Sequence, residues 1–169
     1  MKLRRAIRRD AAGIAALHAA SWRSAYRGLV PERRLGAGLE NNRHWRWRVL
    51  LATMTARDVV LVADEGGQLV GFIAVWTDRT APALIDNLHV APELRGKGIG
   101  ERLLRAAARG LRARKIKRAF LWAFVANGPA LRFYKRLGGL ADRRSFKEFP
   151  PATPPCQRMS WRRFERLAF

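Results

Sequence analysis

One segment, residues 83–125, restricts the fold more than any other part of the sequence. Two apolar stretches, Ala83–Val90 and Ala119–Val125, have the length and side chains of buried strands. Between them a glycine-rich turn leads into apolar residues at helical spacing, from Leu103 to Leu111. A strand–helix–strand unit of this kind joins two parallel strands of one sheet. The segment therefore predicts a sheet with a parallel pair and a helix packed on it.

The flanking segments add further elements. A short strand is predicted at Leu3–Ile7, and Asp10 is expected to cap the helix that follows and ends near Gly28. A second helix is predicted over residues 32–53, with a bend near Gly36–Gly38. The remaining predictions are the strands Val59–Ala63, Leu69–Trp76, Ala141–Phe146 and Cys156–Phe164, and a short helix over Pro129–Leu137.

Together these elements predict a single domain over residues 1–169 in the α/β (α+β) class. Its central sheet is expected to be mixed and mostly antiparallel, with about seven strands and helices on both faces. The apolar runs are far shorter than the ~20 residues that cross a bilayer, and no signal peptide is recognised. The single cysteine, Cys156, excludes an internal disulfide. These observations lead us to expect a cytoplasmic protein.

The charge of the chain is strongly positive. There are 34 Lys and Arg residues against 13 Asp and Glu, which gives +21. Such a field attracts polyanions, including nucleic acids and phosphorylated cofactors. The basic residues are mostly arginines, however, and they occur in nearly every segment. This distribution favours a general excess of arginine over a selected nucleic-acid patch.

The glycine-rich turn has the features of a phosphate-binding loop. Gly96, Gly98 and Gly100 lie between a strand and a helix N-terminus, where backbone N–H groups and the helix dipole favour an anion. The dinucleotide fingerprint does not fit, because Glu101 occupies the sixth position counted from Gly96. The P-loop pattern fails as well, because Gly98 follows Lys97. A turn without any ligand is the alternative.

Three segments resemble the GCN5-related N-acetyltransferase (GNAT) superfamily. Arg95-x-x-Gly98-x-Gly100 resembles its acetyl-CoA motif, [QR]-x-x-G-x-[GA]. Asn127–Gly138 resembles its second signature, N-x-x-A-x-x-F-Y-x-x-x-G, and Ser21–Gly28 resembles the first helix of many members. The segments occur in family order over nearly the whole chain, so the resemblance implies a GNAT-like acyl-CoA N-acyltransferase fold. Gly139 departs from the pattern, because an aromatic residue is usual there.

The resemblance implies acetyl-CoA as the acetyl donor and no metal. In the family the glycine loop binds the pyrophosphate, and the strand before it supplies backbone groups to the pantetheine arm. The acetyl-CoA-binding residues implied in this way are Leu88, His89, Val90, Arg95, Gly96, Lys97, Gly98, Ile99, Gly100, Asn127, Ala130 and Tyr134.

Acetyl transfer to an amine requires the movement of two protons. An alkylamine has a pKa of about 10.4, so it must lose a proton before it can attack. The resemblance implies that Tyr134 donates a proton to the departing thiolate, and that a backbone N–H near His89 or Val90 stabilises the oxyanion. A core aromatic beside Phe133 is the alternative role for Tyr134, and a helix cap is the alternative for Asn127.

The general base is left open between several groups. Asp86 is the favoured catalytic carboxylate, and the alternating strand period places it on one face with Leu88. His89 has a suitable pKa range but is expected on the opposite face. Glu32 and a water chain are further candidates. The polar pair Asp86 and Asn87 indicates a cleft or, alternatively, a β-bulge.

The predicted acceptor-binding residues are Trp22, Tyr26, Glu32 and Asn87. Trp45 and Trp47 are also candidates, although aromatics at helical spacing favour packing. The expected function is acetyl transfer to a primary amine of a small molecule, by direct attack in a ternary complex. Alternatives are a ribosomal or N-terminal protein acetyltransferase, a basic nucleic-acid-binding module without catalysis and a coenzyme A-binding regulator. A homodimer is a further option, nucleic-acid and acidic protein partners are less favoured, and no membrane partner is expected.

Overall fold

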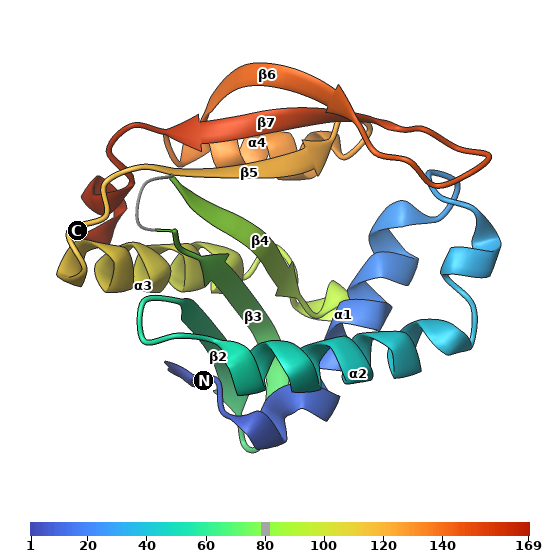
Figure 1. Cartoon of the computed structure of the whole chain (residues 1–169), viewed down its shortest axis with the longest axis horizontal. Helices are drawn as coiled ribbons and strands as arrows, with labels where there is room; N and C mark the ends of the chain where they lie inside the picture. The colour runs from blue at the N-terminus through green and yellow to red at the C-terminus, as the bar shows by residue number, and fades with distance from the viewer. Residues whose placement is uncertain (79–81) are drawn as a thin grey trace.

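The computed structural model describes residues 1–78 and 82–169, which form one seven-stranded sheet with helices on both faces. The strand order is β1-β2-β3-β4-β5-β7-β6, and β4 with β5 is the parallel pair among antiparallel neighbours (Figure 1). The predicted fold class is thereby confirmed. The strands are β1 (Lys2–Arg5), β2 (Val59–Glu65), β3 (Gln68–Trp76), β4 (Ala83–Val90), β5 (Ala119–Phe124), β6 (Leu140–Phe146) and β7 (Pro155–Trp161).

Four α-helices and four short 3-10 turns complete the described residues. They are η1 (Arg8–Asp10), α1 (Ala11–Tyr26), η2 (Glu32–Arg34), α2 (Gly38–Thr53), η3 (Pro92–Leu94), α3 (Ile99–Ala113), α4 (Gly128–Arg136) and η4 (Phe164–Ala168). No helix in the described ranges has both the length and the hydropathy to span a membrane.

The two faces of the sheet carry separate apolar clusters. On one face α3 buries Leu103, Leu104 and Leu111, whose spacing places them on one side of the helix. On the other face Ile14 of α1 and Trp47 of α2 pack with apolar side chains of β2 and β3. A helix layer therefore covers each face, as the sequence predicts.

Two boundaries differ from the predicted ones by three residues or more, and the others lie within two residues. The predicted helix over residues 32–53 is interrupted: η2 ends at Arg34, and α2 begins only at Gly38. The predicted strand Cys156–Phe164 ends at Trp161, because Phe164 enters η4 and is fully buried in the core. In both cases a 3-10 turn takes the place of residues that were predicted to belong to a helix or a strand.

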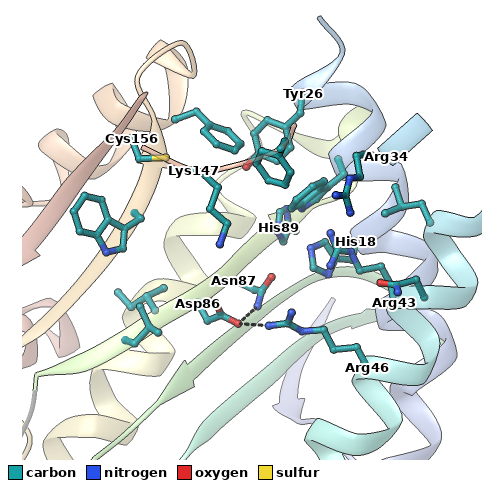
Figure 2. Close-up of a pocket in the computed structure, with 18 of the residues that line it drawn as sticks. His18, Tyr26, Arg34, Arg43, Arg46, Asp86, Asn87, His89, Lys147 and Cys156 are labelled. Atoms are coloured by element: carbon teal, nitrogen blue, oxygen red, sulfur yellow. Dashed lines mark hydrogen bonds and ion pairs between the residues drawn. The ribbon is translucent and has the colours of Figure 1, made fainter. Parts of the chain in front are cut away.

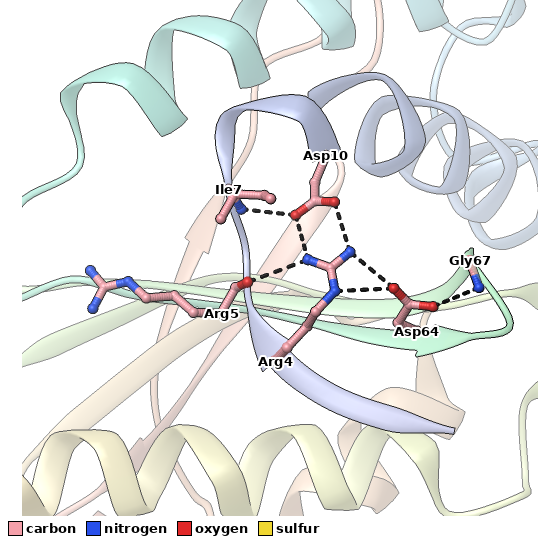
Figure 3. A network of polar contacts seen from close by, with 6 residues as sticks. All are labelled: Arg4, Arg5, Ile7, Asp10, Asp64 and Gly67. Carbon is pink, nitrogen blue, oxygen red and sulfur yellow. Dashed lines mark hydrogen bonds and ion pairs between the residues drawn. The ribbon is translucent and has the colours of Figure 1, made fainter.

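Asp10 does not cap α1 with its side chain, contrary to the prediction. Its carboxylate instead accepts hydrogen bonds from the Ile7 N–H at 2.8 Å and from the guanidinium of Arg4 at 2.7 and 2.9 Å (Figure 3). Arg4 also donates to Asp64, which accepts a hydrogen bond from the Gly67 N–H. The network joins β1, η1 and the β2–β3 turn.

Strand β4 is irregular in two ways that shape the centre of the molecule. It pairs with β5 at Ala83 and Leu84, and beyond these residues the two strands diverge. It also contains a β-bulge: Ile85 and Asn87 oppose consecutive residues of β3, so Asp86 is the extra residue. The predicted bulge alternative is thus correct, and the bulge lies where the strands separate.

Candidate active site

Two cavities meet in the middle of β4, one on each side of the gap between β4 and β5. The first, of about 890 Å³, runs along the glycine loop and α4, and we call it the cradle cavity. The second, of about 740 Å³, lies against α1 and α2, and we call it the α1–α2 cavity. The residues that line both are Tyr26, Ile85, Asp86, Asn87, His89 and Trp122.

The glycine loop forms one end of the cradle cavity. Gly96 and Gly98 have φ values of +79° and +78°, a region that other residues rarely adopt, and a Cβ atom at either would meet nothing within 4 Å. Gly98 is the N-cap of α3, so the first N–H groups of that helix lack intrahelical partners. Open space beside unpaired N–H groups and a positive helix end suits a diphosphate.

The basic residues of the loop differ in their positions. Arg95 lines the cradle cavity, and its guanidinium donates to Ser24 Oγ at 3.0 Å and to Ser21 Oγ at 3.1 Å. It thereby ties the loop to α1. Lys97 is exposed and is not among the described residues that line the cavity. Gly100 and Ile99 do line it, as predicted for acetyl-CoA-binding residues.

The exposed edge of β4 forms one wall of the cradle cavity. Leu88, His89 and Val90 line it, at positions where β3 pairs with the other edge of the strand. Because β5 has already diverged, backbone N–H and C=O groups of this edge face the gap. The oxyanion donor that the resemblance implies near His89 or Val90 would come from this edge.

The opposite wall is formed by the start and the face of α4. Asn127 caps this helix, because its Oδ1 accepts a hydrogen bond from the Ala130 N–H at 3.2 Å. Asn127, Ala130 and Tyr134 all line the cavity. The Tyr134 ring contacts Phe133 and Trp161, so it belongs to the core as well. Burial raises the pKa of Tyr134, and its hydroxyl therefore stays protonated at neutral pH.

Asp86 lies where the two cavities meet, and its Oδ2 has several partners. It accepts hydrogen bonds from Trp76 Nε1 at 3.1 Å and from Asn87 Nδ2 at 2.8 Å, and Arg46 lies 3.8 Å away (Figure 2). The prediction that Asp86 and His89 face opposite sides is wrong. The bulge breaks the alternation of β4, and both side chains line the α1–α2 cavity.

His89 is neutral in the site and its protonation state follows from its neighbours. Burial, together with the smaller effects of Arg95 and Arg43, lowers its pKa to about 3. Its Nδ1 lies 2.9 Å from Ser21 Oγ. Arg95 already donates to that hydroxyl, so the hydroxyl hydrogen is free to bond to Nδ1. With so low a pKa, His89 is a weak base at neutral pH, and its neutral ring offers one donor and one acceptor nitrogen.

The predicted acceptor-binding residues fall into two groups. Trp22, Tyr26 and Asn87 line the α1–α2 cavity, where the rings of Trp22 and Tyr26 meet edge to face at 5.0 Å between centroids. Glu32 lies on η2 and is not among the described residues that line either cavity. Trp47 is buried in the core and Trp45 is 69% exposed, so neither joins the site.

The basic side chains of the α1–α2 cavity were not predicted from the sequence. They come from η2, α2 and the β6–β7 connection. They are Arg33, Arg34, Arg43, Arg46 and Lys147. The spacing of Arg43 and Arg46 by three residues on one helix was a usable signal. Arginine is so frequent in this chain that the pair did not stand out.

Comparisons with known proteins agree with this architecture. The model of the acetyltransferase (GNAT) family matches residues 14–139. Streptothricin acetyltransferase of Streptomyces lavendulae is 41% identical over 87 residues, which are 49% of this chain and 44% of that protein. The chain spans about half the length of the curated relatives it matches.

Solved structures match over almost the whole chain. The PaiA N-acetyltransferase from Thermoplasma acidophilum, in complex with coenzyme A, has a TM-score of 0.78 at 18% identity, covering 92% of this chain and 96% of that one. The ribosomal-protein-alanine N-acetyltransferase from Brucella melitensis has a TM-score of 0.72 at 20% identity, with 95% and 98% covered. At sequence identities of 18% and 20%, these two matches show a shared fold and no more. With the family match over most of its length, the chain belongs to the GNAT family of acetyltransferases.

Proposed function

We propose that the protein transfers an acetyl group from acetyl-CoA to a primary amine of a small molecule, with both substrates bound at once. The observation that carries the proposal is the meeting of the two cavities at Asp86, Asn87 and His89. A donor in the cradle cavity and an acceptor in the α1–α2 cavity would face each other there. Direct attack gains most of its rate from such alignment.

The cradle cavity suits acetyl-CoA in its separate parts. The glycine loop and the N-terminus of α3 would hold the pyrophosphate, and the free edge of β4 would hold the pantetheine arm. The bound donor supplies an activated thioester. A backbone N–H of β4 would stabilise the negative charge that develops on the carbonyl oxygen. Tyr134, protonated because of its burial, would donate a hydrogen bond to the sulfur.

The α1–α2 cavity favours the neutral form of an amine. Arg43 and Arg46 lower the pKa of His18, a buried residue of the same cavity, in addition to the larger effect of burial. The same positive potential would lower the pKa of an ammonium group placed there. Asp86 has one oxygen, Oδ1, free of described hydrogen bonds, and it would accept the released proton directly or through water.

The connection between β6 and β7 partly covers the α1–α2 cavity, which favours a small acceptor over a polypeptide. The connection between β6 and β7 reaches across to η2, where Arg33 donates a hydrogen bond to the Pro150 carbonyl. Phe149 of the same connection packs edge to face against Trp22, with centroids 6.2 Å apart. Figure 1 shows this connection extending over α1 toward η2. A protein chain would have to displace the connection in order to present an internal side chain.

The first test is a calorimetric titration with acetyl-CoA at about 150 mM salt, with ATP as the control polyanion. We expect saturable binding of acetyl-CoA at micromolar concentration and no comparable binding of ATP. A screen of small amines, read by release of free thiol, should then identify acceptors. Equal and salt-sensitive binding of both nucleotides would contradict the proposal, because the basic surface alone would account for it.

A further inference from the structure

The wall of the α1–α2 cavity is unbalanced in charge. Five cationic side chains line it against one carboxylate, that of Asp86. Two of the cations have partners: Arg33 bonds to the Pro150 carbonyl, and Arg46 pairs with Asp86. For the side chains of Arg34, Arg43 and Lys147, no hydrogen bond or ion pair is described. Figure 2 shows Lys147 pointing toward the space in front of Asp86 and Asn87.

Arg43 is the most unusual of these side chains. Its guanidinium stacks over the ring of Trp22 at 4.3 Å, which fixes its position. Its Nε is buried without a hydrogen-bond partner, and no ion pair is described for its side chain. Burial and the neighbouring Arg46 lower the pKa of Arg43, and the Asp86 carboxylate offsets only part of this effect. Arg43 Nε is thus a buried donor that no described side chain satisfies, and an oxyanion bound beside it would satisfy it.

His18 supplies a second unpaired donor beside the first. Its side chain is 4% exposed and lines the same cavity. Trp47 Nε1 donates to His18 Nδ1 at 3.1 Å, and because indole is only a donor, the imidazole proton lies on Nε2. That Nε2 is also buried without a partner. Two unpaired donors in one cationic cavity are suited to an acceptor group on a bound ligand.

We propose that the acceptor amine also carries a small oxyanion, a carboxylate or a phosphoryl group, and that Arg43 is its main ligand. Arg34 of η2 and Lys147 of the β6–β7 connection line the same cavity. The anion would sit at the α2 wall, and the amine would point toward Asp86 and the cradle cavity. This inference deepens the proposed function and rests on it for the transfer step.

The charge of the substrate then explains how an amine enters a positive cavity. A simple ammonium or a polyamine would be repelled by the five cations. An acceptor that bears both charges is attracted through its anionic end, and its ammonium end is the one that the positive potential deprotonates. Specificity would come from the buried donors, because an acceptor without the anion leaves them unpaired.

The test compares each acid with its own amide. Amino acids and aminoalkylphosphonates are assayed beside their uncharged amides or esters, in the wild type, Arg43→Gln and Arg48→Gln. Arg48 is the matched control, since it is exposed on the same helix and outside both cavities. We expect the wild type to prefer the acid by at least about tenfold in kcat/KM. Arg43→Gln should reduce this ratio by about tenfold or more, and Arg48→Gln should leave it unchanged.

A binding measurement separates this inference from the proposed function. Methylphosphonate, which has the anion but no amine, is titrated into the same three proteins. Tight binding of methylphosphonate by the wild type and Arg48→Gln, and loss of this binding in Arg43→Gln, supports the subsite. If the same proteins acetylate no amine, only the transfer proposal fails. Equal binding by all three proteins, or acids and amides acetylated equally well, overturns the subsite while leaving acetyl transfer intact.

Discussion

At the scale of single residues, Tyr134 shows how one side chain serves both the core and the site. Its ring packs against Phe133 and Trp161, while its position on α4 places it in the wall of the cradle cavity. Substitution by phenylalanine preserves this packing and removes only the hydroxyl. We expect Tyr134→Phe to lower kcat by about 100-fold, because the departing sulfur loses its hydrogen-bond donor. Binding of acetyl-CoA, measured by calorimetry, should change little.

The control for this substitution is Tyr26→Phe, the same chemical change on α1. Tyr26 lines both cavities beside Trp22, so the loss of its hydroxyl should act on the KM of the acceptor more than on kcat. Because burial raises the pKa of Tyr134, its proton remains in place and no alkaline loss of rate from its ionisation is expected below about pH 10. A Tyr134→Phe enzyme with unchanged kcat would remove the tyrosine from the mechanism.

At the scale of secondary-structure elements, the Arg4–Asp10–Asp64 network holds the edge of the sheet together. Hydrogen bonds from Arg4 and from the Ile7 N–H keep the pKa of Asp10 below its ordinary value. A carboxyl with a lowered folded-state pKa stabilises the fold above its unfolded pKa of about 3.9, and this stabilisation is lost as the pH falls through the folded value. We expect Asp10→Asn to cost about 2 kcal/mol at pH 7 in denaturant unfolding.

The matched control is Asp142→Asn on β6. Asp142 also receives two hydrogen bonds from one arginine, Arg158, but its side chain is 34% exposed on an edge strand. An exposed pair contributes less than about 1 kcal/mol. The destabilisation of Asp10→Asn relative to the wild type should shrink as the pH is lowered below about 4. A difference that stays constant down to pH 2 would show that the charge of Asp10 contributes nothing.

Some features of the helices and strands were predictable from the sequence, and others were not. The glycine loop and Asn127–Gly138 could be recognised because backbone requirements confine them to few residue types. The face of Asp86 was predicted wrongly: the polar pair Asp86 and Asn87 indicated a bulge as one alternative, but only the pairing with β3 shows that Asp86 is the extra residue. The basic wall of the α1–α2 cavity was also missed, because only the spacing of Arg43 and Arg46 pointed to it. Arg43 and Lys147 come to line one cavity only when the chain folds. In the sequence, each has the features of a solvated surface residue.

At the scale of the whole molecule, the two cavities meet in the gap between β4 and β5. This arrangement favours a reaction in which both substrates bind before the acetyl group is transferred. Six shared residues connect the cavities, so the proposed donor and acceptor would fit in the protein together. A covalent acetyl-enzyme would require a nucleophile at this junction. Cys156 lines the α1–α2 cavity, but burial raises the pKa of its thiol, which makes it a poor nucleophile at neutral pH.

We therefore expect sequential kinetics, with initial-velocity lines that intersect when both substrates are varied. Cys156→Ala should retain kcat within about threefold, since a buried cysteine acts mainly as a small apolar side chain. Intact-mass spectrometry of the wild type after incubation with acetyl-CoA alone should find no acetylated protein. Parallel initial-velocity lines, together with an acetyl group on Cys156 that is lost in Cys156→Ala, would instead require a two-step transfer. In that case the alignment of two bound substrates across β4 could not be the source of the rate.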